Sequence, residues 1–244
     1  MNNIVILIIF LFSVIHFLEF SSFYSRISGI ETGYKLISYS IQQTTFVGTR
    51  FFFIFLMPLL GLIVDEKIGK DSYMYMIFLS LSGATLAYLI SYFLKRKIIN
   101  SFSKVILEFN SNKGYVHSFY IGLKFFFKNL FLKDKIKNTE KIELNLRVLI
   151  PASFIFCCYS IAVFLSFYFA LLYYDYRSTI SQLSGIVNAF ATLVLTLYIE
   201  PKISKSIDNK SSNAANDIYS LLVGRFIGVA IISPLIVYIV VSLA

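Results

Sequence analysis

The chain has 244 residues, of which 57% are hydrophobic and only 14% are charged. A soluble domain carries about 25% charged residues, so this composition excludes an ordinary soluble domain, and no polar stretch is long enough for a large extramembrane catalytic domain. The net charge of +9 would suggest nucleic acid in a soluble protein, but in a membrane protein the position of each cation matters more than the sum, and we predict no nucleic-acid partner.

Six long apolar runs predict six transmembrane helices. A helical span needs about 20 apolar residues, whereas a barrel strand needs about ten residues of alternating polarity. The sequence therefore predicts an all-α, polytopic membrane helical bundle that forms a single integral membrane domain over residues 1–244. We expect the first run to be a retained helix, because no cationic region or small-residue cleavage motif accompanies it. The runs are Ile4–Phe20, Leu36–Val64, Tyr73–Leu94, Val148–Tyr174, Ile180–Ile199 and Ile218–Leu243.

Ionisable residues gather at the end of the first run. His16 and Glu19 are three residues apart, and Arg26 lies seven residues beyond Glu19, which places all three on roughly one helix face. A charge near the bilayer centre costs at least ~3 kcal/mol, so each is a candidate functional group. We predict that His16 and Glu19 act in coupling or ion pairing. The alternative is interfacial anchoring with one internal ion pair.

The second run carries a polar stripe through a Phe-rich segment. Stripes of hydroxyls and amides usually pack helices together, but packing requires no permanent cation, so Arg50 is the unexplained group. Pro58 lies inside this run and predicts a kink or a break. The stripe consists of Ser38, Gln42, Thr45 and Thr49, with Gln43 beside it.

Residues 95–147, between the third and fourth runs, hold twelve of the 22 lysines and arginines. The positive-inside rule places this segment in the cytoplasm. Apolar residues recur in it at helical spacing, which predicts an interfacial helix on the anionic lipids of the inner leaflet. The alternative is a solvated basic loop that only sets the topology. The stripe is Tyr115, Phe119, Leu123, Phe126 and Leu130, and further lysines near the end are Lys133, Lys135, Lys137 and Lys141.

The cations also predict the orientation of the whole bundle. With six spans, seventeen cations fall on the cytoplasmic side, including Lys210, and three fall outside, namely Lys67, Lys70 and Arg177. Both termini are then expected outside the cell, in a bacterial cytoplasmic membrane.

The fifth and sixth runs carry small and polar residues of the kind that let helices approach closely. Arg225, between Gly224 and Gly228 in the sixth run, is again the residue that packing does not explain, and Pro234 predicts a kink there. Gly48, Arg50 and Pro58 echo this pattern in the second run, which suggests a 3+3 repeat of helices. The polar residues of the fifth run include Gln182 and Asn188.

The unexplained arginines, Arg26, Arg50 and Arg225, suit a diphosphate or carboxylate because guanidinium forms paired hydrogen bonds with such anions. Glu19 is their expected resting partner. The sequence contains no nucleotide-binding glycine loop and no metal-ligand motif, and the adjacent cysteines at 157 and 158 point in different directions on a helix. We therefore expect no cofactor and no metal, and the lack of a close intramembrane carboxylate pair disfavours catalysis.

A series of motifs runs through both halves of the chain. In order and spacing these motifs resemble the Amj-type lipid II flippases, a bacterial family of six-helix membrane proteins. The basic central loop has no counterpart in this resemblance, and Glu19, Glu31, Gln43 and the Phe52-Phe53 pair depart from the family pattern, which leaves the identity of the sugar open. The motifs are His16-x-x-Glu19-x-x-Ser22-x-x-x-Arg26-x-x-Gly29-x-x-Thr32, Ser38-x-Ser40, Arg50, Pro58-x-x-Gly61, Tyr176-Arg177, Gln182-Leu183-Ser184-Gly185, Asn188, Ala191-Thr192, Glu200-Pro201 and Val223-Gly224-Arg225.

The resemblance implies a flippase that moves an undecaprenyl-diphosphate-linked sugar, lipid II or a related lipid-linked oligosaccharide, from the inner to the outer leaflet without nucleotide hydrolysis. The three arginines would hold the diphosphate. The alternatives are a flippase for an O-antigen or other surface-polysaccharide unit, a scaffold or permease subunit that works with cell-envelope synthesis enzymes, and a lipid-headgroup enzyme. The residues expected to contact the sugar are Gln42, Gln43, Gln182 and Asn188, and those expected in coupling or ion pairs are His16, Glu19 and Arg177.

Overall fold

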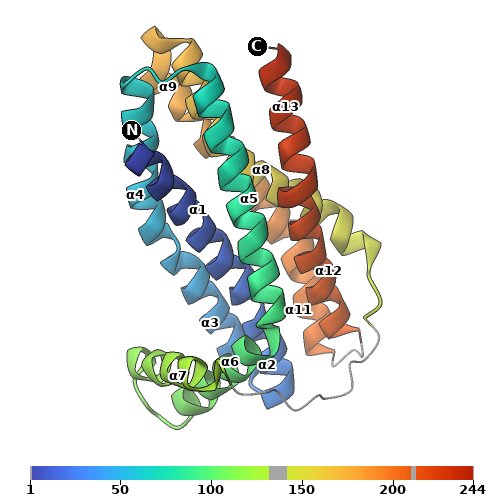
Figure 1. The fold of residues 1–244 in the computed structure, drawn as a ribbon. Coiled ribbons are helices and arrows are strands. Elements are labelled where there is room, and N and C mark those ends of the chain that lie inside the picture. Colours follow the sequence, from blue (N-terminus) through green and yellow to red (C-terminus); the bar gives the residue numbers. More distant parts are fainter. Residues whose placement is uncertain (1, 132–141, 210–212, 244) are drawn as a thin grey trace.

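A computed structural model of the chain describes residues 2–131, 142–209 and 213–243. Across these residues the protein is all-α, and six helical segments are long and apolar enough to cross a membrane, which confirms the predicted fold class (Figure 1). The segments are Asn3–Thr32, Lys35–Asp65, Lys70–Phe93, Leu146–Leu172, Tyr174–Asp208 and Ala214–Leu243. The predicted cytoplasmic cations Lys133, Lys135, Lys137, Lys141 and Lys210 lie outside the described residues.

Most spans consist of more than one helix. The first contains α1 (Asn2–Ser22) and α2 (Tyr24–Thr32), the second α3 (Lys35–Gly48) and α4 (Arg50–Asp65), and the third and fourth are single helices, α5 (Lys70–Phe93) and α8 (Leu146–Leu172). The fifth contains η1 (Tyr174–Tyr176), α9 (Arg177–Ser181), α10 (Leu183–Val194), η2 (Leu195–Ile199) and α11 (Glu200–Asp208). The sixth contains α12 (Ala214–Ile227), η3 (Gly228–Ile232) and α13 (Ser233–Leu243).

The elements η2 and η3 are π-turns, and each stands immediately before a proline-containing helix. Proline lacks an N–H and its ring clashes with the carbonyl four residues earlier. The carbonyls in question, those of Leu197 and Ala230, lie inside the two π-turns, where the wider helix gives the rings of Pro201 and Pro234 room. The predicted disturbance of the sixth helix at Pro234 is therefore present.

The second span is not broken at Pro58, one of the two outcomes predicted there, since helix α4 continues through this residue. The span is interrupted earlier, by a turn at Thr49. This turn places the Thr49 side chain in the core while Arg50 is exposed.

Helix α8 is the central element of the bundle. Two-thirds of its apolar window (67%) is buried inside the protein, against 17% for the fifth span. Helix α12 packs closely against it, because a Cβ at Gly224 would lie 2.5 Å from the Leu149 carbonyl oxygen and one at Gly228 would collide with the Ser153 carbonyl oxygen. The glycines flanking Arg225 are thus explained by the contact of α12 with α8.

Helices α6 (Lys95–Asn110) and α7 (Tyr115–Asn129) form a hairpin between the third and fourth spans. The hairpin lies across one end of the bundle, beside α2 and α3 (Figure 1). The start of α1 and the end of α13 lie toward the opposite end (Figure 1). This arrangement agrees with the even number of crossings predicted from the sequence.

Candidate functional site

A buried ion pair joins the first and sixth spans. The Arg225 guanidinium in α12 pairs with the Glu19 carboxylate in α1. Arg225 is completely buried, and the Glu19 side chain is 10% exposed. The sequence predicts that Glu19 is the resting partner of an arginine, and the structure identifies this arginine as Arg225.

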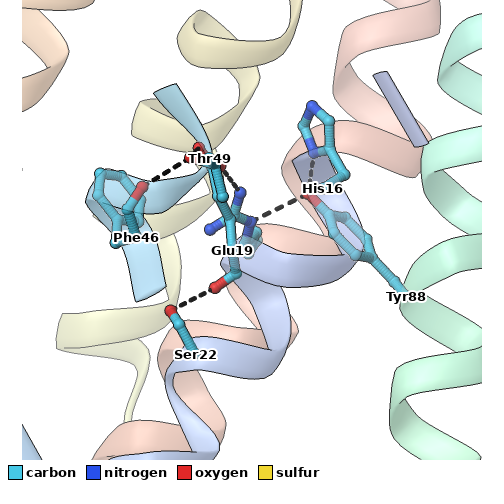
Figure 2. A network of polar contacts seen from close by, with 7 residues as sticks. His16, Glu19, Ser22, Phe46, Thr49 and Tyr88 are labelled. Atoms are coloured by element: carbon cyan, nitrogen blue, oxygen red, sulfur yellow. Dashed lines mark hydrogen bonds and ion pairs between the residues drawn. The ribbon is translucent and has the colours of Figure 1, made fainter. Parts of the chain in front are cut away.

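Side chains from two further spans complete a network around this pair (Figure 2). The Arg225 Nε–H donates to the Tyr88 hydroxyl of α5 at 3.0 Å, and Nδ1 of His16 hydrogen-bonds to the same hydroxyl. The Thr49 hydroxyl is shared between the Glu19 carboxylate at 3.2 Å and the Phe46 carbonyl oxygen at 2.6 Å. The network therefore ties together the first, second, third and sixth spans.

The guanidinium of Arg225 is not fully satisfied by these contacts. Its Cζ lies 4.4 Å from the centre of the Phe156 ring, a cation–π distance. Among the described residues, Nη1 finds no hydrogen-bond partner although it is buried. Because an unpaired buried donor is costly and rare, Nη1 is a position where an anionic ligand oxygen would be stabilised.

A second buried arginine lies in α2. The Arg26 Nε–H donates to Gln42 Oε1 at 2.5 Å, and Nη2 pairs with Glu200 Oε2 at 2.5 Å. The Tyr39 ring lies 4.1 Å from its Cζ. The side chains of Arg26 and Glu200 are only 5% and 13% exposed, so this pair joins the first, second and fifth spans in a largely dry environment.

The two pairs share the first span. Seven residues separate Glu19 from Arg26, which corresponds to about 10 Å along a helix. Each guanidinium contacts its carboxylate through Nη2, while its Nε–H donates to a second side chain, Gln42 for Arg26 and Tyr88 for Arg225. The first span thus contributes one anion and one cation to buried pairs, and each is held by an opposite charge from the second half of the chain.

The fifth span explains why hydropathy does not mark Glu200 as a buried group, although Glu200 belongs to one of the family motifs. Its apolar run ends at Ile199, so Glu200 reads as a residue at a helix end. In the structure the span continues to Asp208, and Glu200 becomes a partly buried ionised group inside it. Tyr88 and Tyr39 carry no sequence signal either, because isolated tyrosines are common in this chain.

Arg50 belongs to neither ion pair. Its guanidinium is exposed and lies 5.8 Å and 5.6 Å from the rings of Phe46 and Phe53. Arg50 therefore lies outside both buried networks in this structure.

The remaining predicted residues are spread over the second and fifth spans. Gln42 is buried at Arg26, whereas Gln43 is half-buried and Gln182 is exposed. The Asn188 Oδ1 atom is buried and, within the described part of the chain, has no hydrogen-bond partner. Arg177 pairs at 2.9 Å with Asp65 on the exposed surface, far along the chain from either buried pair.

No group of three or more His, Cys, Asp or Glu side chains that could hold a metal ion occurs in the part of the chain that the structure describes. The chemistry available at the site is that of two paired guanidinium groups, tyrosine hydroxyls and amides. Such groups bind anions and sugar hydroxyls.

Comparison with known proteins gives the chain a family context. A family model described as "Amj: Alternate to MurJ" matches residues 11–242. The lipid II flippase Amj of Bacillus subtilis (strain 168) is 24% identical over 232 residues, which cover 88% of this chain and 84% of the relative. No solved structure matches the chain.

Proposed function

Because the chain belongs to the Amj (Alternate to MurJ) family, we propose that it is a flippase that moves an undecaprenyl-diphosphate-linked sugar from the inner to the outer leaflet of a bacterial cytoplasmic membrane. It is a multi-pass membrane protein of a transporter family rather than a catalytic enzyme. The Bacillus subtilis relative is named a lipid II flippase, which supports lipid II as the lipid-linked sugar carried here.

The observation that carries the proposal is the pair of buried arginines, each held by a carboxylate. A diphosphate presents oxygens that a guanidinium binds in the same paired manner as a carboxylate. Arg225 is fully buried, and its Nη1 has no hydrogen-bond partner within the part of the chain that the structure describes. Arg26 lies in the same span as the partner of Arg225. The diphosphate would displace Glu200 at one arginine and Glu19 at the other as it crosses.

The polar side chains around these arginines suit the sugar. Gln42 already contacts Arg26, and the Asn188 amide oxygen is buried without a partner among the described residues. Gln43 and Gln182 offer further amide groups on the second and fifth spans. An amide can both donate to and accept from a sugar hydroxyl.

The driving force needs no nucleotide. A membrane potential acts on each charge with ~2.3 kcal/mol per 100 mV, which favours outward movement of an anionic headgroup when the interior is negative. Proton uptake and release by His16 would couple transport to protons, because its ring hydrogen-bonds to Tyr88 next to Arg225. The basic α6–α7 segment would lie on the cytoplasmic side, with both chain ends outside, as the positive-inside rule requires.

The test uses a bacterial strain that depends on this gene for flipping and measures the outer-leaflet exposure of the labelled lipid-linked sugar. Arg26, Arg50 and Arg225 are each replaced by Ala and by Lys. We expect the Ala variants to lose flipping and the Lys variants to recover it in part, because lysine keeps the charge but loses the paired geometry. Arg147→Ala, at an exposed position to which no role in binding or coupling is assigned, is the matched control.

Undiminished flipping by a correctly inserted Ala variant would remove that arginine from the proposed site. Purified protein that flips no lipid-linked sugar in vesicles, but co-purifies stoichiometrically with a cell-envelope synthesis enzyme, would support a scaffold instead.

A further inference from the structure

A pocket of about 270 Å³ lies between α1, α3 and the α6–α7 hairpin, at the end of the bundle where α7 crosses it (Figure 1). Four phenylalanines from three helices form much of its wall. They are Phe17, Phe102, Phe119 and Phe126. The pocket is separate from both ion pairs, and nothing in the proposed path of the sugar uses it.

The few hydroxyl groups in the wall are already occupied. Ser21 hydrogen-bonds to Ser91 at 2.8 Å, and Thr45 and Ser101 each donate to a backbone carbonyl in their own helix at 2.8 Å. A site for water or a polar ligand needs free donors or acceptors in its wall. The pocket therefore suits hydrocarbon.

One residue of the pocket wall also reaches the surface of α7. Leu123 lines the pocket and is also 57% exposed. It belongs to an exposed apolar stripe, which explains how a hydrocarbon chain would reach the pocket from the membrane. The other members of the stripe are Val116, Tyr120, Phe127 and Phe131, which are 62–93% exposed.

This stripe differs in part from the one predicted from the sequence. Of the predicted residues, Phe119 and Phe126 face the pocket, and Tyr115 hydrogen-bonds to Thr44 of α3. Helix α7 is thus apolar on two sides. One side closes the pocket, and the other is free to contact lipid.

The pocket adjoins the Arg26 pair along α3, although no residue of that pair lines it. Thr45 in its wall lies three residues after Gln42, which contacts Arg26, and this spacing corresponds to about 5 Å along α3. Lipid whose anionic head is bound at Arg26 would have the first part of its chain beside the pocket. The nearby basic residues of the hairpin, such as Lys124 and Lys128, complement an anionic headgroup rather than a neutral one.

The geometry points to a binding site for the polyprenyl chain of the lipid-linked sugar in this pocket, with the diphosphate at Arg26. This inference rests on the proposed function. The α6–α7 hairpin then has a specific role, because it supplies two of the four walls of the site that receives the chain from the inner leaflet.

The test uses the full-length protein in lipid nanodiscs with undecaprenyl diphosphate that carries a photoreactive diazirine near its head. Peptide mapping after irradiation should place the label on the pocket walls in α1, α6 and α7. An excess of about tenfold of unlabelled undecaprenyl diphosphate should lower the label about tenfold by simple competition. The same amount of phosphatidylglycerol should not.

Thr45→Phe fills the pocket from α3 and should lower the label about tenfold. Ser101→Leu fills the pocket from α6 and replaces Thr45→Phe in the test if that variant does not fold. Val47→Phe, at a 61% exposed position of the same helix, is the matched control and should label like the wild type. Equal labelling in both filled variants would overturn the inference, as would equal displacement by phosphatidylglycerol or label spread evenly over lipid-facing helices.

The outcome separates this inference from the proposed function. A protein that flips the lipid-linked sugar but is never labelled in the pocket refutes the chain site alone. A protein that is labelled in the pocket but never flips refutes the flippase and leaves a lipid-binding site.

Discussion

Removal of one partner of the Glu19–Arg225 pair should destabilise the protein strongly. Glu19→Gln leaves the guanidinium of Arg225, which is completely buried, without its counter-charge. Breaking a buried pair from one side costs about 3–5 kcal/mol, whereas replacing both partners by neutral residues of similar volume is often neutral. We therefore expect about 3 kcal/mol of destabilisation for Glu19→Gln, a similar loss for Arg225→Met, and recovery in the double variant.

The assay is a double-mutant cycle from unfolding of the purified protein in detergent micelles, with each variant measured in the same lipid and salt. The coupling free energy should reach about 6 kcal/mol, because two single losses of about 3 kcal/mol each disappear in a double variant of near-neutral stability. The control is a cycle on Arg177 and Asp65, whose side chains are 43% and 56% exposed, and which should couple by no more than ~1 kcal/mol.

A coupling free energy of the buried pair as small as that of the control would refute the reasoning, as would a double variant no more stable than the worse single variant. Flipping gives an independent readout. The double variant should regain stability but not flipping, because it lacks Arg225, one of the two buried cations proposed to bind the diphosphate.

Three further predictions concern other parts of the molecule. Gly228→Ala should destabilise the protein by about 1–3 kcal/mol, measured by unfolding in detergent micelles, because the added Cβ meets the backbone of α8. The control Gly185→Ala has open space around it and should be neutral or slightly stabilising. Glu200→Gln should tighten binding of undecaprenyl diphosphate, measured by competition, because the carboxylate that competes for Arg26 is lost; unchanged or weaker binding would contradict this role. Two neighbouring lysines hold the pKa of Glu108 in α6 at about 2, below its unfolded value of about 4.3. The small stabilising effect of the ionised Glu108 should therefore be present above about pH 4 and lost as the pH falls toward about 2. Amide exchange in α6 should show this acid dependence in the wild type and lose it in Glu108→Gln.

The apolar runs predict the spans well but not where they end. The first run stops at Phe20, yet the helical span continues to Thr32. Hydropathy fails here because the serines that follow are buried and hydrogen-bonded internally. The Ser28 hydroxyl, for example, donates to the Ile99 carbonyl oxygen of α6 at 2.8 Å, and the Ser25 hydroxyl to the Ser38 carbonyl oxygen at 3.0 Å. As a result Arg26 lies within the helical span rather than in a loop.

The sequence identifies the charged groups that packing cannot explain, but it does not pair them. Glu19 could serve Arg26 in its own span or Arg225 in the last one, and only the packing of α1 against its neighbours decides for Arg225. Glu200 is not predicted as the partner of Arg26, because hydropathy places it at the end of a helix. Sequence patterns report one helix at a time, whereas ion pairs depend on which helices become neighbours.

The π-turn η3 has a consequence for how the sixth span tolerates insertions and deletions. One residue corresponds to about 100° of rotation around a regular helix, but the wide turn of η3 absorbs its extra residue and keeps α13 in phase with α12. Deleting one residue between Val229 and Ile232 would therefore leave a regular α-helix in which Val237 stays buried. The same deletion would remove the wide turn that gives the Pro234 ring room. A homologue with a one-residue gap at this position should therefore lack this proline but keep the buried face of α13.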